Sequence, residues 1–169
     1  MLKVDLGHLQ SERRVEIAED LAPDDPIWND SGIELKKPLA VRLEVQLAGE
    51  DVLVRGHFDG EVGLECRRCL VPVTVEIDED VSFLLRPDLE PVEAEEQEVY
   101  TFASQERELD LTPAVREQAL LAIPKYAVCR EACRGLCPQC GANLNEEECR
   151  CEPEEVDERW AALRKLKFD

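Results

Sequence analysis

Apolar and polar residues alternate over much of the segment from Leu39 to Leu85. The alternation occurs in three runs, 41–47, 52–64 and 71–77, in which apolar residues occupy every second position, except that Gly56 and Gly60 interrupt the middle run. A period of two is typical of a strand that buries one face and exposes the other. We therefore predict that this segment forms an antiparallel sheet.

Two short polar segments separate these runs and predict the turns between the strands. Gly49-Glu50-Asp51 can turn the first strand into the second. Glu65-Cys66-Arg67-Arg68-Cys69 lies between the second and the third, so we expect a cysteine pair at the tip of a hairpin. Pro72 lacks a backbone N–H group, so its strand lies at an edge or bonds only through its other groups.

Helical spacing replaces the period of two in the second half of the chain. Thr112 offers a hydroxyl cap, Pro113 suits the first helical position, and apolar residues then recur at helical spacing up to Pro124. We expect this helix of about three turns to cover the sheet. A last helix is predicted over residues 156–167, where the apolar residues share one face.

These patterns predict an α+β fold. We expect an antiparallel β-sheet or partial barrel covered by a helix, followed by a cysteine-rich C-terminal segment and a terminal helix. Residues 1–105 would form the mainly β part, with a cysteine pair at its hairpin tip. Residues 106–169 would contain the covering helix, the cysteine-rich module and the last helix.

The chain is strongly acidic, with a formal net charge of -19 at pH 7. Such a charge repels nucleic acid at long range and attracts basic proteins. The acidic residues gather near residues 87–98, which we interpret as an exposed loop, and again over residues 146–157. The last ten or so residues are locally basic through Arg159, Arg164, Lys165 and Lys167. Each run is also compatible with a simple solvated surface.

Four pairs of cysteines supply the candidate chemistry: Cys66 and Cys69, Cys129 and Cys133, Cys137 and Cys140, and Cys149 and Cys151. A short spacing lets one turn direct two thiolates at the same ion, and two pairs complete a tetrahedral zinc site. The alternative, a disulfide framework, belongs to secreted chains. The N-terminal residues contain no apolar run typical of a signal peptide or a membrane span, so we expect a reduced, cytoplasmic protein.

The spacing also indicates how eight cysteines would divide between two structural zinc ions. Four of them lie within fifteen residues and are expected to form one local site: Cys137, Cys140, Cys149 and Cys151. By elimination, the second site would combine Cys66 and Cys69 with Cys129 and Cys133, which ties the sheet to the C-terminal segment. Gly141 follows Cys140 where a zinc knuckle needs a residue free to take positive φ. A swap in which Cys133 joins the local site remains open, as does an iron–sulfur cluster in place of zinc.

Cys137-Pro-Gln-Cys140 superficially matches a dithiol redox motif, which would indicate an enzyme. Such motifs need a strand before the pair and a helix after it, whereas glycine, asparagine and further cysteines follow here. Neither His8 nor His57 lies beside a candidate nucleophile, and the sequence has no glycine loop of the phosphate-binding type. We therefore expect no enzymatic activity and no small-molecule substrate.

Five short motifs follow one another along the chain: Glu65-Cys66-Arg67-Arg68-Cys69-Leu70, Leu121-Ala122-Ile123-Pro124, Gly135-Leu136-Cys137-Pro138-Gln139-Cys140-Gly141, Asn143-Leu144-Asn145 and Cys149-Arg150-Cys151. In this order and spacing they resemble the bacterial YceD family, also described as large ribosomal RNA subunit accumulation proteins. The resemblance runs from about Leu39 to the end of the chain. One departure lies in the tail, where the family usually reads Asp-Pro-Arg and this chain has Asp157-Glu158-Arg159.

The resemblance implies a role in the accumulation of large-subunit (23S) ribosomal RNA, and hence in ribosome assembly. It also implies a non-enzymatic factor whose gene often neighbours that of a small basic protein of the large subunit.

Two hypotheses for the partner follow. Our leading hypothesis is an assembly factor that binds a basic large-subunit ribosomal protein through its acidic loops, which include Glu93, Glu95 and Glu96. A chain with a net charge of -19 is ill suited to coat phosphate, because affinity for RNA comes from lysine and arginine that release counterions. The alternative is direct binding of ribosomal RNA or precursor particles through Arg67, Arg68 and the basic last helix with Arg164, Lys165 and Lys167. The two hairpin arginines would equally offset the charge of a four-cysteine site. No membrane partner is expected.

Overall fold

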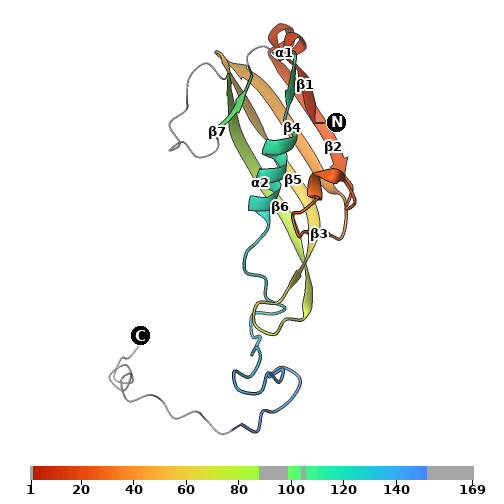
Figure 1. Ribbon diagram of the computed structural model, residues 1–169, viewed down its shortest axis with the longest axis vertical. Helices are drawn as coiled ribbons and strands as arrows, with labels where there is room; N and C mark the ends of the chain where they lie inside the picture. The colour runs from red at the N-terminus through yellow and green to blue at the C-terminus, as the bar shows by residue number, and fades with distance from the viewer. Residues whose placement is uncertain (1, 88–98, 104–105, 152–169) are drawn as a thin grey trace, which may run out of the picture.

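The computed structural model describes residues 2–87, 99–103 and 106–151, and its centre is a long, twisted sheet (Figure 1). The strands of the sheet lie in the order β2-β4-β5-β6-β7, and β3 pairs with β5 beside β4. Their bounds are β2 Arg14–Leu21, β3 Glu34–Leu35, β4 Leu39–Ala48, β5 Asp51–Glu65, β6 Pro72–Pro87 and β7 Val99–Phe102. All neighbouring strands are antiparallel except β6 and β7, which run parallel. The predicted antiparallel sheet is thus confirmed.

The core lies on one face of this sheet, as the alternation predicts. Val41 and Val45 of β4 point to the same face as Val54 and Phe58 of β5, and all four side chains are fully buried. Removing such side chains from water stabilises the fold by about 1.5 to 3 kcal/mol for each one. The turn between β4 and β5 is the predicted one, and Gly49 takes a φ of 72° there.

The N-terminal elements extend the fold beyond what the sequence predicted. Strand β1 (Lys3–Asp5) pairs with β8 (Glu108–Asp110) in a separate two-stranded sheet, and helix α1 (Leu6–Glu12) follows β1 directly. The carboxylate of Asp5 caps α1 by accepting a hydrogen bond from the backbone N–H of His8 at 2.6 Å. A short 3-10 helix, η1 (Pro26–Trp28), joins β2 to β3.

Helix α2 (Thr112–Ala122) covers the sheet and contacts β6 and η1 (Figure 1). Its position confirms the predicted helix, but the predicted hydroxyl cap is wrong. Leu111 occupies the cap position, and Thr112 is already inside the helix with no capping bond from a side chain at the cap. The carboxylate of Asp110 instead accepts the Thr112 N–H at 2.9 Å. A carboxylate satisfies an unpaired N–H at a helix start at least as well as a hydroxyl does.

The chain after residue 106 first packs into the core and then reaches the tip of the β5–β6 hairpin. Strand β8 and helix α2 pack into the same core as the N-terminal strands through Leu109, Val115 and Ala119. The chain then runs along the β5–β6 hairpin to its tip, where the cysteine-rich residues lie (Figure 1). The division at residue 105 stays a prediction. The acidic loop at residues 88–98 and the last helix at 156–167 lie outside the described residues. Neither α1 nor α2 is long and apolar enough to cross a membrane.

Gly56 is a point at which the sheet has no room for a side chain. A Cβ atom there would overlap the carbonyl oxygen of Arg42 and lie 2.6 Å from Cδ2 of Leu43. We predict that Gly56→Ala lowers the free energy of unfolding by about 1 to 3 kcal/mol, as overpacking does, and urea unfolding measures this. Gly63→Ala in the same strand is the control, because its Cβ would first meet the flexible end of the Lys36 side chain. An equal loss for both variants would contradict this explanation.

Candidate metal centres and neighbouring surfaces

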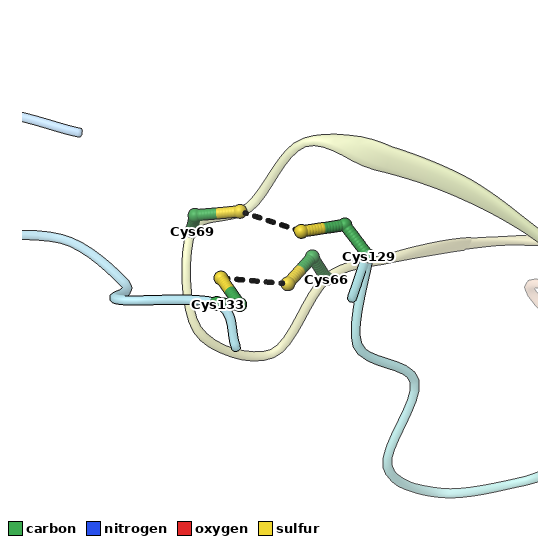
Figure 2. Close-up of side chains that lie close together, drawn as sticks. All are labelled: Cys66, Cys69, Cys129 and Cys133. Carbon is green, nitrogen blue, oxygen red and sulfur yellow. Dashed lines mark hydrogen bonds between the residues drawn. The ribbon is translucent and has the colours of Figure 1, made fainter. Parts of the chain in front are cut away.

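The first candidate metal centre lies at the tip of the β5–β6 hairpin, and we call it the hairpin centre. Its sulfurs all lie within 4.8 Å of one another and come from Cys66, Cys69, Cys129 and Cys133. Figure 2 shows the two cysteines of the hairpin turn facing the two from the C-terminal segment, with sulfur–sulfur distances of 3.9 Å from Cys66 to Cys133 and 3.6 Å from Cys69 to Cys129. Four sulfurs bound to one zinc ion in a tetrahedron lie about 3.8 Å apart. The spacing therefore fits a single tetrahedral ion.

The second set, the C-terminal centre, is made entirely from a short stretch of chain. Its sulfurs also lie within 4.8 Å of one another and come from Cys137, Cys140, Cys149 and Cys151. Cys149 lies 3.2 Å from Cys137 and 3.7 Å from Cys140, measured between sulfurs. All eight cysteines are free thiols, not disulfides. The predicted grouping is confirmed, and the swap that would move Cys133 into the C-terminal centre is wrong.

The two centres use the same backbone turn. In the hairpin centre the N–H of Cys66 donates to the carbonyl of Val71, and the N–H of Leu70 donates to that of Cys66, both at 2.8 Å. In the C-terminal centre the N–H of Cys137 donates to Ala142 at 2.8 Å, and the N–H of Gly141 donates to Cys137 at 2.9 Å. Each turn directs two sulfurs and several N–H groups toward the same point.

The residue after the second cysteine of each turn has a left-handed backbone. Gly141 has a φ of 74°, as the sequence predicted, and Leu70 has a φ of 61°. A side chain in this region carries a strain of about 1 to 2 kcal/mol that glycine avoids. The strained leucine shows that the surroundings of the hairpin centre hold this turn firmly in place.

The electrostatics of both centres favour a cation. In the C-terminal centre, backbone N–H groups led by that of Cys140 lower the pKa of Cys137 to about 6. Hydrogen bonds with Cys149 and Cys140 raise the pKa of Cys151 to about 12. Burial raises the pKa of Cys66, but backbone N–H groups of Cys129 and the hairpin turn outweigh it and lower this pKa to about 6. Four thiolates so close repel one another unless a cation lies among them, and a soft divalent ion fits an all-sulfur set.

The structure assigns different contacts to the two hairpin arginines, both of which are exposed. The guanidinium of Arg68 donates from Nη1 to the carbonyls of Glu131 at 3.1 Å and Cys133 at 3.0 Å. Arg68 thereby fastens the hairpin to the C-terminal segment. The guanidinium of Arg67 instead lies 3.9 Å from the centroid of the Tyr126 ring. The Arg68 guanidinium is thus engaged by backbone carbonyls, whereas that of Arg67 stacks on an exposed ring.

Asn145 links the two centres, and sequence reasoning gave it no individual role. Its Oδ1 accepts hydrogen bonds from the N–H of Arg134 at 2.8 Å and from Nη2 of Arg130 at 3.0 Å. Its Nδ2 lies 3.4 Å from the sulfur of Cys133, to which it donates. The loop that belongs to the C-terminal centre thus contributes a hydrogen bond to a sulfur of the hairpin centre. The Asn143-Leu144-Asn145 motif was the only signal for it in the sequence.

A group of carboxylates occupies the outer face of the hairpin, away from the core. Asp59 of β5 lies directly opposite Asp78 of β6, and Glu61 lies directly opposite Glu76. We call these four residues the acidic face. Like charges directly opposite one another destabilise a sheet. The alternation in the sequence already placed these residues on the polar side, but the pairing register was needed to bring them together.

The cations beside the acidic face respond to its charge. His57 contacts Asp78 at 3.1 Å and Asp80 at 2.9 Å. The hydrogen bond with Asp80 raises the pKa of His57 above its usual value, and the nearby charges of Asp78 and Asp59 add to this effect. Lys37 forms an ion pair with Glu61, which likewise raises the pKa of its ammonium group. The acidic face therefore already attracts positive charge within the protein.

Six further residues predicted to bind a partner lie outside the described residues: Glu93, Glu95, Glu96, Arg164, Lys165 and Lys167.

The chain is similar in sequence to a known protein family and to several individual proteins. The sequence profile described as large ribosomal RNA subunit accumulation protein YceD matches residues 54–167. An uncharacterized protein of Mycobacterium tuberculosis is 35% identical over 126 residues, covering 74% of this chain and 60% of the relative. The chain thus spans about 60% of the length of that relative.

Two further relatives extend the comparison. The maize (Zea mays) protein named large ribosomal RNA subunit accumulation protein YCED homolog 1, chloroplastic, is 27% identical over 184 residues, covering 91% of this chain and 62% of that protein. The uncharacterized protein YlbN of Bacillus subtilis is 30% identical over 143 residues, covering 81% of this chain and 78% of the relative. No solved structure is significantly similar to this chain.

Removing one sulfur from each centre tests the grouping of the cysteines. We predict that Cys133→Ser and Cys151→Ser each lower the metal content, measured by elemental analysis, from about two ions per chain to about one. Cys133→Ser, and not Cys151→Ser, should expose the chain between Lys125 and Cys137 to limited proteolysis, because the hydrogen bonds of Arg67 and Arg68 alone hold this part to the sheet less firmly than the hairpin centre does. Retention of both ions by either variant would contradict the grouping.

Asn145 lies in the loop of the C-terminal centre but donates a hydrogen bond to Cys133 of the hairpin centre. We therefore predict that replacing Asn145 weakens metal binding at the hairpin centre. In the otherwise unchanged chain, with both centres loaded, Asn145→Ala should weaken the affinity of the hairpin centre for its metal about tenfold, as loss of an outer hydrogen bond to a ligand does. Chelator competition measures the affinity. The control is Asn29→Ala, which replaces an exposed asparagine far from Asn145 in the sequence. Equal affinities for the Asn145 and Asn29 variants would show that the hydrogen bond is incidental.

Proposed function

Because the chain belongs to the YceD family, we propose that it is a ribosome biogenesis factor that supports the accumulation of large-subunit (23S) ribosomal RNA. Two plant relatives that bear the name large ribosomal RNA subunit accumulation protein support this role. The factor acts in the cytoplasm, where its thiols stay reduced. It acts by binding and not by catalysis.

The partner in this proposal is a small basic protein of the large ribosomal subunit. The observation that carries it is the acidic face, where Asp59 opposes Asp78 and Glu61 opposes Glu76. Carboxylates in each opposed pair repel one another, Lys37 and His57 offset only part of this charge, and a cationic partner offsets the rest. The net charge of -19 adds a long-range attraction for basic proteins. A basic ribosomal protein shielded in this way is kept from premature contact with RNA.

The ions in this proposal are two structural zinc ions, one in each centre. Sulfurs within 4.8 Å of one another suit a single ion that all four can reach. In an iron–sulfur cluster the cysteines bind different iron atoms and are held further apart. Zinc has no redox chemistry of its own, so it would hold the hairpin and the C-terminal segment in a fixed arrangement.

Neutralising the acidic face tests the partner. Tagged wild-type protein, captured from the source cells at moderate salt, should retain one small basic large-subunit protein that survives nuclease treatment. Conversion of Asp59, Asp78, Glu61 and Glu76 to their amides should abolish this retention because the charge that attracts the partner is gone. Mass spectrometry of the retained proteins measures both results.

The matched control removes four exposed carboxylates elsewhere, namely Asp24, Asp30, Glu106 and Glu117. It has the same net charge as the first variant and should retain the partner. The variant of the acidic face loses its like-charge pairs but also the exposed ion pairs of Lys37 with Glu61 and of His57 with Asp78, so its urea unfolding midpoint should stay close to that of wild type. Equal retention by the two variants, or proteins retained only through nuclease-sensitive RNA, would overturn the proposed partner.

A further inference from the structure

An exposed aromatic ring with a guanidinium stacked on it lies beside the hairpin centre. Tyr126 has 67% of its residue surface exposed, and the Arg67 guanidinium lies over its ring, 3.9 Å from the centroid. The backbone N–H of Arg67 donates to the carbonyl of Ala127 at 2.9 Å, which fixes the two chain segments against each other. The ring is thus exposed to solvent while the Arg67 stack and this hydrogen bond hold its chain segment in place.

The apolar surface of the described residues is concentrated near the same place. Of the four large apolar side chains that the described residues expose, three lie there: Leu70 at 56%, Tyr126 at 67% and Val128 at 43%. Leu70 lies in the hairpin turn, and Tyr126 and Val128 lie in the segment that reaches Cys129. Leu70 is also the residue with the strained backbone. Exposed apolar groups in this number are typical of a binding surface.

The charge of this region is opposite to that of the whole chain. We call residues 66–70 and 125–136 the hairpin tip. They contain one carboxylate, that of Glu131, and five cations: Arg67, Arg68, Lys125, Arg130 and Arg134. Among the described residues, none of the five has a carboxylate within ion-pairing distance. Four thiolates around a divalent ion leave two negative charges, so the cations exceed what the centre needs.

From these contacts we propose that the hairpin tip binds single-stranded RNA, with Tyr126 as a stacking platform and Arg67 as the phosphate contact. Unpaired bases stack on aromatic rings and on guanidinium planes, and arginine donors reach the phosphates. A duplex offers no free base face to the ring. A surplus of cations within a chain of net charge -19 suits a polyanion and not a basic protein.

The structure separates Arg67 from the other hairpin arginine in this role. Arg68 uses its guanidinium on the carbonyls of Glu131 and Cys133 and so holds the tip together. Among the described residues Arg67 makes no such bond, and a guanidinium stacked on a ring can still donate from its N–H groups to a ligand. This RNA surface goes beyond the proposed protein partner, which binds a different set of residues. Failure of one proposal therefore leaves the other standing.

The test uses the full chain, purified with its metal, and a fluorescein-labelled 12-nucleotide oligouridylate at 50 mM salt. Fluorescence anisotropy should show binding to this single strand and much weaker binding to a duplex of the same length. Tyr126→Ala should weaken binding about tenfold, whereas Tyr126→Phe keeps the ring and the affinity. Arg67→Ala should weaken binding and make it less dependent on salt.

The controls separate a direct contact from a damaged fold. Arg67→Lys keeps the charge but loses the planar stack, so it should preserve the salt dependence and lose affinity. Arg55→Ala removes an exposed cation from β5, outside the tip, and should leave binding unchanged. All variants should keep the metal content and the urea unfolding midpoint of wild type.

Three results would overturn the proposal. The first is an absence of binding by wild type at 50 mM salt. The second is equal affinity of wild type and both alanine variants. The third is a variant of the tip that loses a retained protein while binding RNA as wild type does, which would assign the surface to a protein partner.

Discussion

Contact between four sulfurs at the hairpin tip is the constraint on which the C-terminal part of this structure depends. Residues 125–151 contain no helix or strand beyond an isolated bridge between Leu136 and Asn143. Few of their side chains are buried, and most of the buried ones are cysteines. A segment with so little apolar burial cannot order itself against the loss of chain entropy. A metal ion bound in the hairpin centre would offset the repulsion among the thiolates. Its binding would then supply the stabilising free energy that apolar burial supplies in a hydrophobic core.

The surfaces with a proposed role depend on this constraint to different degrees. Tyr126 is set against Arg67 because the two chain segments meet at the hairpin centre, and Arg68 and Asn145 secure the same junction with hydrogen bonds. The acidic face depends only on the register of β5 and β6. Loss of metal should therefore disturb the cationic tip and spare the acidic face. A factor built in this way can offer one surface to a basic protein and another to RNA.

The sequence predicted those features whose signal is local. Alternation over 39–85 located β4, β5 and β6, because a strand that buries one face must alternate. The cysteines divided correctly because four of them lie close enough in sequence to close one site, which leaves a single grouping for the rest. The hydroxyl cap of α2 was wrong because Thr112 is already inside the helix, and the carboxylate of Asp110, two residues earlier, accepts its N–H group. Strand β1 is only three residues long and pairs with β8 across most of the chain, which no local pattern reveals. The stack of Arg67 on Tyr126 likewise depends on tertiary contact.

Zinc K-edge X-ray absorption spectroscopy of the purified chain, together with its metal stoichiometry, tests the central claim most directly. The account predicts two zinc ions per chain, each surrounded by four sulfur atoms at about 2.3 Å with no nitrogen or oxygen ligand. One ion per chain, nitrogen or oxygen ligands, or iron in place of zinc would contradict it. In that case the hairpin tip would have to be held to the C-terminal segment by some other means.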